Sequence, residues 1–489
     1  MVFIRRLDTD CTIIGLSNQT GVRPVWLLIS SHRSIKVKTI DRKWWALVAI
    51  GTGSFMAALD GSVVNTILPV VREAFTTNVA TIEWVVTIYL LVLSGLLLTF
   101  GRLGDLRGHK SVYVWGFGIF ASSSALCGAT LTIETLILFR SLQAVGAAML
   151  ASNAPAILTG NFPGNMRGRA LGLVSMMTYI GLTVGPSFGG WLAQAFGWRS
   201  VFYINVPVGA LALIMSMAFI PKDSPAESGQ RFDLPGGLLF LAGLTALLLG
   251  LNKGADWGWM SLPVLGLLTG AILLMFIFIM IERRSPAPML DLSLFHVRLF
   301  SAATVSAVLN YVCVYTITFL MPFYLIQGRG LNSAQAGLLL TAQPIIMAIA
   351  APVSGTLSDR IGSRWPGMIG MGLLAAGLFL LAGLGSATPL VFAGLALALA
   401  GLGTGIFISP NTSALMGSAP KQRQGIASGV QAAARNIGMV LGIGLAGAIF
   451  TTHLAQNTSD VLYRGIDMGF LAAAGIAILG IFMSAIKEN

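Results

Sequence analysis

Fourteen apolar runs fill this chain between Trp44 and Ile486. Each run has about the 20 residues that a helix needs to cross some 30 Å of hydrocarbon. Charged residues make up 10% of the sequence, against about 25% in ordinary soluble domains, so a water-exposed surface cannot be built from them. We therefore expect an all-α integral membrane protein with fourteen transmembrane helices. The runs are 44–70, 82–101, 111–131, 134–158, 169–193, 201–220, 234–252, 262–282, 300–326, 334–357, 366–385, 389–412, 425–450 and 466–486.

The basic residues between these runs lie mainly on one side of the membrane. With both termini on that side, its loops and tails hold 23 Lys and Arg residues, and the opposite loops hold 5. Because cytoplasmic loops carry such an excess, we expect a multi-pass protein of the inner or plasma membrane with both termini in the cytoplasm. The same topology explains the net charge of +12, so no nucleic acid partner is expected.

Two pairs of similar segments indicate that the chain contains two related halves. GRLGDLRGHK at 101–110 and GTLSDRIGSR at 355–364 share Gly, Leu, Asp and Gly at matching positions. GLTVGPSFGG at 181–190 and GMVLGIGLAG at 438–447 share three glycines at nearly the same separation. Parallel halves are a transporter architecture, with the substrate site between them. The expected domains are a six-helix bundle at 44–220, two additional central helices with linkers at 221–298, and a second six-helix bundle at 299–489.

Residues 1–43 differ from the rest because they are polar and basic. Their one apolar run, Val25–Ile29, is too short to span a bilayer, and the segment lacks the pattern of a signal peptide. We expect a poorly ordered cytoplasmic tail, or residues that precede the natural start of translation.

Asp60 is the one acidic residue that falls deep within an apolar run. It lies about 16 residues, or roughly 24 Å, along its helix from the inner end, and Arg140 lies roughly 9 Å below the outer end of the fourth helix. At this similar depth the two side chains are expected to pair. Charged groups inside a membrane are costly and usually functional. Arg435, nearer the cytoplasmic end of its run, either snorkels to the interface or has a role of its own.

Three interpretations of the Asp60 and Arg140 pair are open. The first is a proton switch, because loss of water favours the neutral form of a carboxyl group and a nearby guanidinium favours the ionised form. The second is attraction of a cationic substrate. The third is a structural pair that fixes the register of the two helices.

The segment 101–110 and its repeat at 355–364 are candidates for an inner gate. Gly101 and Gly108 allow a tight turn between helices. Asp105 can pair with a cation or with the positive N-terminus of a neighbouring helix, and such contacts would hold the cytoplasmic face shut. Retention of positive charge in the cytoplasm is the alternative. The candidate gate residues are Gly101, Asp105, Arg107, Gly108, Lys110, Asp359 and Arg360.

The fifth run is rich in glycine and contains a proline that removes a backbone hydrogen bond. Glycines on one helix face allow close packing against a neighbour, and this packing is also the simplest explanation of the pattern. The residues concerned are Gly181, Gly185, Pro186, Gly189 and Gly190.

At these motifs the chain resembles the major facilitator superfamily, and within it the fourteen-span drug:proton antiporter family. GRLGDLRGHK is similar to the loop signature between the second and third helices, although Leu106 and His109 occupy positions where Arg is usual. FRSLQAVGAA at 139–148 resembles the signature of the fourth helix, which implies a part in proton coupling for Arg140. ALDGSVVNTILP at 58–69 resembles the motif of the first helix that carries the embedded acid.

Two further segments extend the resemblance over about residues 44–486. GLTVGPSFGG is similar to the antiporter motif of the fifth helix, which implies export, and WRSVFYINVPVG at 198–209 resembles the segment that opens the sixth. The resemblance implies proton-coupled multidrug efflux by alternating access, with hydrophobic, cationic small molecules as the expected substrates. Exporters of dications often carry further acids in later helices, which this sequence lacks.

Other functions remain open from the sequence. One alternative is export of a lipid, siderophore or metabolite, and a less favoured one is a membrane sensor that transports nothing. The sequence shows no cluster of a nucleophile and a base that would indicate an enzyme. Its scattered cysteines and histidines do not have the spacing of a metal-binding site. We expect a monomer without a cofactor, whose partners are a small-molecule substrate, protons and the lipid bilayer.

Overall fold

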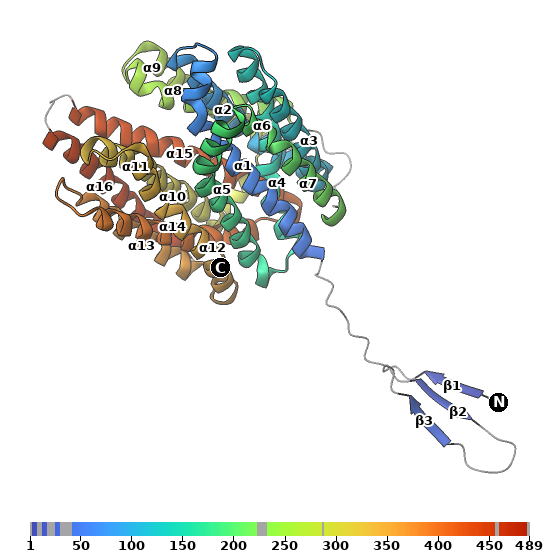
Figure 1. Cartoon of the computed structure of the whole chain (residues 1–489). Helices are drawn as coiled ribbons and strands as arrows, with labels where there is room; N and C mark the ends of the chain where they lie inside the picture. Colours follow the sequence, from blue (N-terminus) through green and yellow to red (C-terminus); the bar gives the residue numbers. More distant parts are fainter. Residues whose placement is uncertain are drawn as a thin grey trace. The chain divides into compact units, whose positions relative to one another are not determined.

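The computed structural model describes residues 2–6, 12–16, 25–29, 42–222, 232–285, 288–454 and 459–486. Within this part, fourteen helical segments are long and apolar enough to cross a membrane, which confirms the predicted number (Figure 1). The helices are α1 (Arg42–Ala74), α2 (Val79–Arg107), α3 (His109–Gly128), α4 (Ile133–Asn161), α5 (Arg167–Phe196), α6 (Ser200–Tyr203), α7 (Asn205–Phe219), α8 (Leu234–Trp257), α9 (Leu262–Glu282), α10 (Arg298–Pro322), α11 (Ser333–Leu340), α12 (Ala342–Ile361), α13 (Arg364–Ala382), α14 (Leu390–Ser418), α15 (Gln424–Leu454) and α16 (Ser459–Ser484). Short 3-10 turns are η1 (Gly164–Met166), η2 (Leu292–His296) and η4 (Lys421–Arg423), and η3 (Phe323–Gly328) is a π-helical turn.

Three spans are interrupted near a proline. Proline has no backbone N–H to donate to the carbonyl four residues earlier. Pro207 leaves the carbonyl of Tyr203, the last residue of α6, without this donor. Pro344 does the same to the carbonyl of Leu340, the last residue of α11. Pro322 ends α10, which continues into the π turn η3. The pairs α6 with α7, α10 with η3, and α11 with α12 therefore each form one span.

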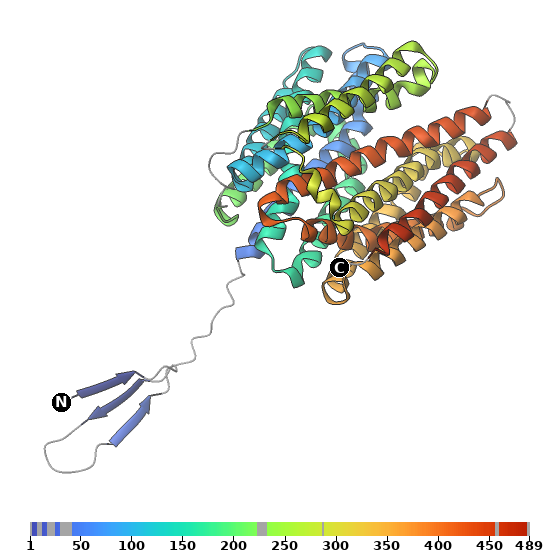
Figure 2. The same ribbon diagram turned by 180° about the vertical axis from the view of Figure 1, so that it is seen from behind.

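Apolar side chains form a core in each half, and a third cluster joins α2 and α4 to α14 and α15 across the two halves. Buried aromatic residues such as Phe117 and Phe120 lie in the core of α1–α7, and Phe407 and Phe470 lie in the core of α10–α16. Figure 2 shows α15 and α16, in red, beside the yellow α10, against which both pack. The expected class, two helical bundles plus two additional helices, is confirmed, and the boundaries at 220 and 298 stay predictions.

The additional helices α8 and α9 pack together, and α8 also contacts both halves of the molecule. A Cβ atom at Gly95 of α2 would stand 2.1 Å from a methyl carbon of Leu241, so α8 lies directly against α2. Lys253 of α8 donates to the carboxylate of Glu83 in α2 at 2.9 Å. Since α8 contacts α15 as well, the insertion covers the line where α2 and α15 meet.

The N-terminal segment forms a unit of its own, Met1–Asp41. It contains the strands β1 (Val2–Arg6), β2 (Thr12–Leu16) and β3 (Val25–Ile29), paired antiparallel in that order. Val2 lies opposite Leu16, and Thr12 lies opposite Ile29. These five-residue segments are rich in β-branched residues, which favour strands. The cytoplasmic tail expected over residues 1–43 stays a prediction.

Candidate functional site

Asp60 of α1 and Arg140 of α4 form the expected ion pair. The guanidinium Nη1 of Arg140 lies 2.8 Å from Oδ2 of Asp60. Both residues are buried, with exposed fractions of 2% and 1%. Because each charge is removed from water, each depends on the other and on the surrounding hydrogen bonds for its stability.

Two amide side chains complete the shell of the Asp60 carboxylate. Its Oδ1 atom accepts from Nδ2 of Asn205 at 2.7 Å and from Nε2 of Gln143 at 3.0 Å. Oε1 of Gln143 in turn accepts from Arg140 at 2.7 Å, and Asn205 also donates to the hydroxyl of Ser124. The ion pair thus sits in a continuous polar network within an otherwise apolar bundle.

Local helix geometry places these residues. Arg140 and Gln143 are three residues apart on α4, so they lie on one face of that helix. Asn205 is the first residue of α7, just after the interruption that Pro207 causes. Arg140 is further held by the carbonyl of Val85 and by the ring of Tyr89, whose centroid is 4.2 Å from the guanidinium carbon. The sequence predicted the pair but missed both amides, because neither bears a charge.

The face of α1 beside Asp60 borders open space. A Cβ atom added at Gly61 would have nothing within 4 Å. This face lies between the side of α1 that holds Asp60 and the side that packs on α5, where Ser62 approaches Gly185.

Three glycines of the fifth span serve close packing. Added Cβ atoms would stand 2.7 Å from the carbonyl oxygen of Phe55 at Gly181, 1.8 Å from Oγ of Ser62 at Gly185, and 2.2 Å from a methyl carbon of Val63 at Gly189. All three contacts are with α1. Pro186 is exposed on α5, and Gly190 has nothing within 4 Å of its Cβ position, so these two predicted motif residues do not join this packing.

Asp105 and Asp359 each cap a helix of the other half. The two carboxylate oxygens of Asp105 accept from the backbone N–H groups of Gly425 and Ile426, at 2.7 and 2.9 Å. Asp359 accepts in the same way from Gly168 and Arg169, at 2.7 and 2.9 Å. These N–H groups belong to the first turns of α15 and α5, whose positive ends attract a carboxylate.

The two caps are matched copies of one arrangement, and we call them the paired caps. Asp105 and Asp359 occupy corresponding positions of the repeat, and Gly168 and Gly425 are separated by nearly the same number of residues. Backbones approach closely at both: a Cβ at Gly101 would stand 2.3 Å from the carbonyl oxygen of Gly425. At Gly355 it would stand 2.1 Å from that of Gly168. The sequence alone did not identify Gly168 and Gly425, whose N–H groups donate to the two carboxylates, although the distance between them in the sequence nearly equals that of the repeat.

The remaining gate candidates have different surroundings. Gly108 makes the turn between α2 and α3 with φ of 92°, a conformation that favours glycine. Lys110 donates to the carbonyl of Met217 at 2.8 Å, so it holds the end of α7. Arg107 and Arg360 are exposed, and no ion pair of either is found in the described part of the chain.

His109, which replaces a usual Arg of the motif, belongs to the first of the paired caps. Its Nε2 lies 3.3 Å from Oδ1 of Asp105, and its Nδ1 lies 2.8 Å from Oδ1 of Asn153. Asn153 uses its own amide hydrogens on the carbonyls of Phe100 and Met149, so both ring nitrogens of His109 face acceptors.

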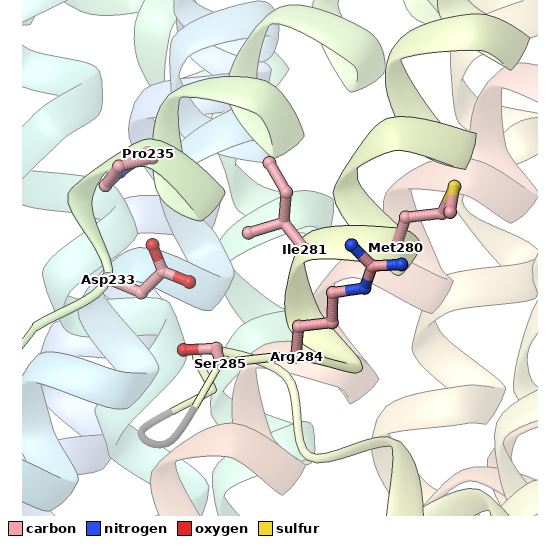
Figure 3. Close-up of a pocket in the computed structure, with 6 residues that line it drawn as sticks. All are labelled: Asp233, Pro235, Met280, Ile281, Arg284 and Ser285. Carbon is pink, nitrogen blue, oxygen red and sulfur yellow. The ribbon is translucent and has the colours of Figure 1, made fainter.

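A pocket is found at the ends of α8 and α9, away from the Asp60 network (Figure 3). Asp233 and Pro235 lie where α8 begins, and Met280, Ile281 and Arg284 lie where α9 ends. None of these residues belongs to the network or to the paired caps. In the described part of the chain no group of three or more His, Cys, Asp or Glu residues is placed to hold a metal ion.

The comparison with protein families decides which architecture this is. The model described as Major Facilitator Superfamily matches residues 50–305 and again residues 303–488. The chain belongs to the Major Facilitator Superfamily. The two consecutive matches agree with the repeat, and a multi-pass transporter of small molecules follows from the family.

Relatives of this superfamily member carry several kinds of name. The riboflavin transporter RibZ of Clostridioides difficile is 33% identical over 450 residues, which cover 91% of this chain and 97% of RibZ. The multidrug resistance protein Stp of Mycobacterium tuberculosis is 33% identical, covering 86% of this chain and 78% of Stp. The tetracenomycin C resistance and export protein of Streptomyces glaucescens is 32% identical, with the same coverage.

Solved structures of the Major Facilitator Superfamily share this fold. The human organic anion transporter MFSD10 superimposes with a TM-score of 0.66 at 16% identity, covering 90% of this chain and 99% of that one. The proton:xylose symporter XylE superimposes with a TM-score of 0.61 at 13% identity, covering 90% and 94%. At these identities the likeness concerns the fold alone.

Proposed function

We propose that this transporter exports hydrophobic small molecules in exchange for protons by alternating access. The observation that carries the proposal is the buried carboxylate of Asp60, held by Arg140, Gln143 and Asn205. Several relatives are named for drug or antibiotic resistance, which supports export as the direction. Asp60 is the group that takes up and releases the proton.

The network supplies both states that a proton carrier needs. With Asp60 ionised, its charge is balanced by Arg140 and its oxygens are filled by three donors. When Asp60 takes a proton, Arg140 loses its counter-charge and keeps the carbonyl of Val85 and Oε1 of Gln143 as acceptors. The resulting excess positive charge favours a rearrangement of α1 against α4, which can be linked to opening or closing of the substrate path.

The paired caps are proposed as the gate that this rearrangement opens. Both caps are formed in this structure, which supports a closed state of the end of the bundle that carries Asp105 and Asp359. The positive-inside rule assigns that end to the cytoplasm. We further propose a monomer of the plasma membrane with both termini inside. A membrane-impermeant maleimide should label an introduced cysteine at exposed Arg360 only after cells are opened.

Proton coupling is tested with purified protein in vesicles under a pH gradient. Asp60→Asn keeps the size of the side chain but cannot release a proton, so substrate-dependent proton flux should fall to background. Glu134→Gln neutralises an exposed acid on α4 and should leave the flux unchanged. Undiminished flux in Asp60→Asn would remove Asp60 from the mechanism.

A metabolite exporter is the second candidate, because the relative RibZ is named a riboflavin transporter. It predicts that a metabolite such as riboflavin raises the melting temperature of the purified protein more than any drug in a panel. A drug exporter predicts the reverse order.

A further inference from the structure

Arg435 is a cation in the middle of the membrane-spanning part, and the described residues supply no partner of opposite charge for it. It lies about 11 residues, or roughly 17 Å, from the start of α15, close to the midplane rather than the interface. No ion pair or hydrogen bond of its guanidinium is found in the described part of the chain, and the side chain keeps some exposed surface. Because an isolated charge at this depth is costly, it indicates a site that a ligand completes.

Tyrosines from both halves gather around this cation. Tyr179 of α5 and Tyr311 of α10 lie in one side-chain cluster that spans the two halves, and Arg435 is near enough to act electrostatically on both of them and on Tyr315. Tyr311 and Tyr315 are one helical turn apart, and the Cβ of Tyr311 lies 2.7 Å from the Cβ position of Gly438, one turn beyond Arg435. The cluster thus joins the first half to the second, where this architecture binds its substrate.

Acidic residues do not balance this site. Among the described residues, Asp60 lies deepest inside a span and is already held by Arg140 and two amides, and Asp467 lies five residues from the start of the last span. Glu83, at the outer end of α2, is paired with Lys253. A cationic substrate would meet an uncompensated positive charge at Arg435, so the geometry disfavours the cation expected from the sequence.

We propose that Arg435, Tyr179, Tyr311 and Tyr315 form the substrate site, and that it takes an aromatic organic anion. The guanidinium binds a carboxylate or phosphate through two parallel N–H bonds, and the phenol groups add O–H donors. The tyrosine rings offer flat apolar surfaces for an aromatic body. This inference rests on the proposed transport function and names the class of its substrate.

Helix α2 connects this anion site with the proton site. The ring of Tyr89 stacks on Arg140 and also interacts electrostatically with Arg435. One residue after Arg435, Asn436 donates to the hydroxyl of Ser94 in α2 at 2.8 Å. An anion bound at Arg435 therefore alters the field at Tyr89, and through it the surroundings of Arg140.

The test uses two dyes with the same xanthene core and opposite charge, fluorescein and rhodamine 123. Binding to the purified protein is measured by fluorescence polarisation without any pH gradient. We expect the wild-type protein to bind fluorescein at least about tenfold more tightly than rhodamine 123, as loss of one charge-assisted hydrogen bond would give. Equal or stronger binding of rhodamine 123, or binding of neither dye, overturns the proposal.

Substitutions at Arg435 and Tyr311 test whether these residues cause the preference for fluorescein. Arg435→Gln should weaken fluorescein binding about tenfold or more, and Arg435→Lys should recover part of it. Tyr311→Phe, which removes one hydroxyl, should weaken it less and serves if Arg435→Gln does not fold. The matched control Arg464→Gln removes an exposed cation from α16 and should change nothing. Unchanged fluorescein binding in Arg435→Gln contradicts the proposal.

Two further measurements separate the possible failures. Displacement of fluorescein by chloride or phosphate at equal concentration would indicate an inorganic anion site, which also overturns the substrate assignment. Asp60→Asn should still bind fluorescein while losing pH-driven flux. If binding follows Arg435 but flux survives in Asp60→Asn, the anion site stands and the proposed proton coupling fails.

Discussion

Replacing Asp105 by Asn should open the end of the bundle that the paired caps close. In the structure its two oxygens accept from the N–H groups of Gly425 and Ile426 at the positive end of α15. Asn keeps one acceptor oxygen but loses the charge. Its NH₂ group is a donor, so it cannot accept a hydrogen bond from the second backbone N–H. The change therefore removes one charge-assisted bond and weakens the other.

The size of the effect follows from the bonds that are lost. A hydrogen bond to a charged group contributes ~1.5–3 kcal/mol, and a carboxylate at a helix N-terminus adds ~0.3–1 kcal/mol. A net loss of ~2–3 kcal/mol shifts the equilibrium between the closed and open gate by roughly 30- to 150-fold towards the open state. Asp359→Asn should act similarly, because the second cap has the same geometry.

The shift can be measured as a distance between spin labels on the two halves. Gly160 and Gly417 suit this purpose, because both are exposed at the gate ends of α4 and α14 and an added Cβ meets nothing within 4 Å. With cysteines at these two positions, Asp105→Asn should enlarge the population at the longer distance. Arg107→Gln, an exposed change two residues further along α2, should not.

The reasoning would be refuted by a distance distribution that neither aspartate variant changes, alone or combined. Such a result would mean that apolar packing holds this end closed and that the caps only terminate helices.

Three further predictions concern packing, the network and the insertion. Gly185→Ala should lower the melting temperature, since overpacking costs ~1–3 kcal/mol, whereas Gly190→Ala meets nothing within 4 Å and should be neutral. Asn205→Leu removes a donor from ionised Asp60, so pH-driven transport in vesicles should slow about tenfold or more while the protein still folds. Lys253→Met removes a partly exposed ion pair with α2 and should change unfolding free energy by less than about 1 kcal/mol, measured by thermal denaturation.

The spans and the ion pair could be read from the sequence because both obey simple physical rules. A lipid-facing helix must be apolar for some 20 residues, so fourteen runs define fourteen spans. A charged residue within such a run is easily recognised, and two opposite charges at similar depth predict an ion pair. Asp60 and Arg140 form this ion pair in the structure. The helix interruptions near Pro207 and Pro344 follow from missing N–H donors, but the sequence did not predict them because the apolar runs continue through both prolines.

The partners of those charges could not be read in the same way. Gln143 and Asn205 are neutral, and many such amides occur along the chain, so only the packing of α4 and α7 against α1 shows which of them reach Asp60. The N-terminal strands show the same limit at short range. Each is five residues long, so pairing with its neighbours rather than its own pattern makes it a strand.

The sequence by itself determined the membrane solvent, the number of crossings, the repeat and the depth of the charged residues, because hydrophobic length and charge cost are local properties of the chain. The tertiary structure alone decided which half caps which helix, and that Tyr311 packs against α15 one turn beyond Arg435. Those facts depend on how α2, α5, α10 and α15 approach one another across hundreds of residues. Close packing of small residues determines which helices meet. Small residues carry no charge and follow no clear period, so the sequence does not show which helix each one packs against.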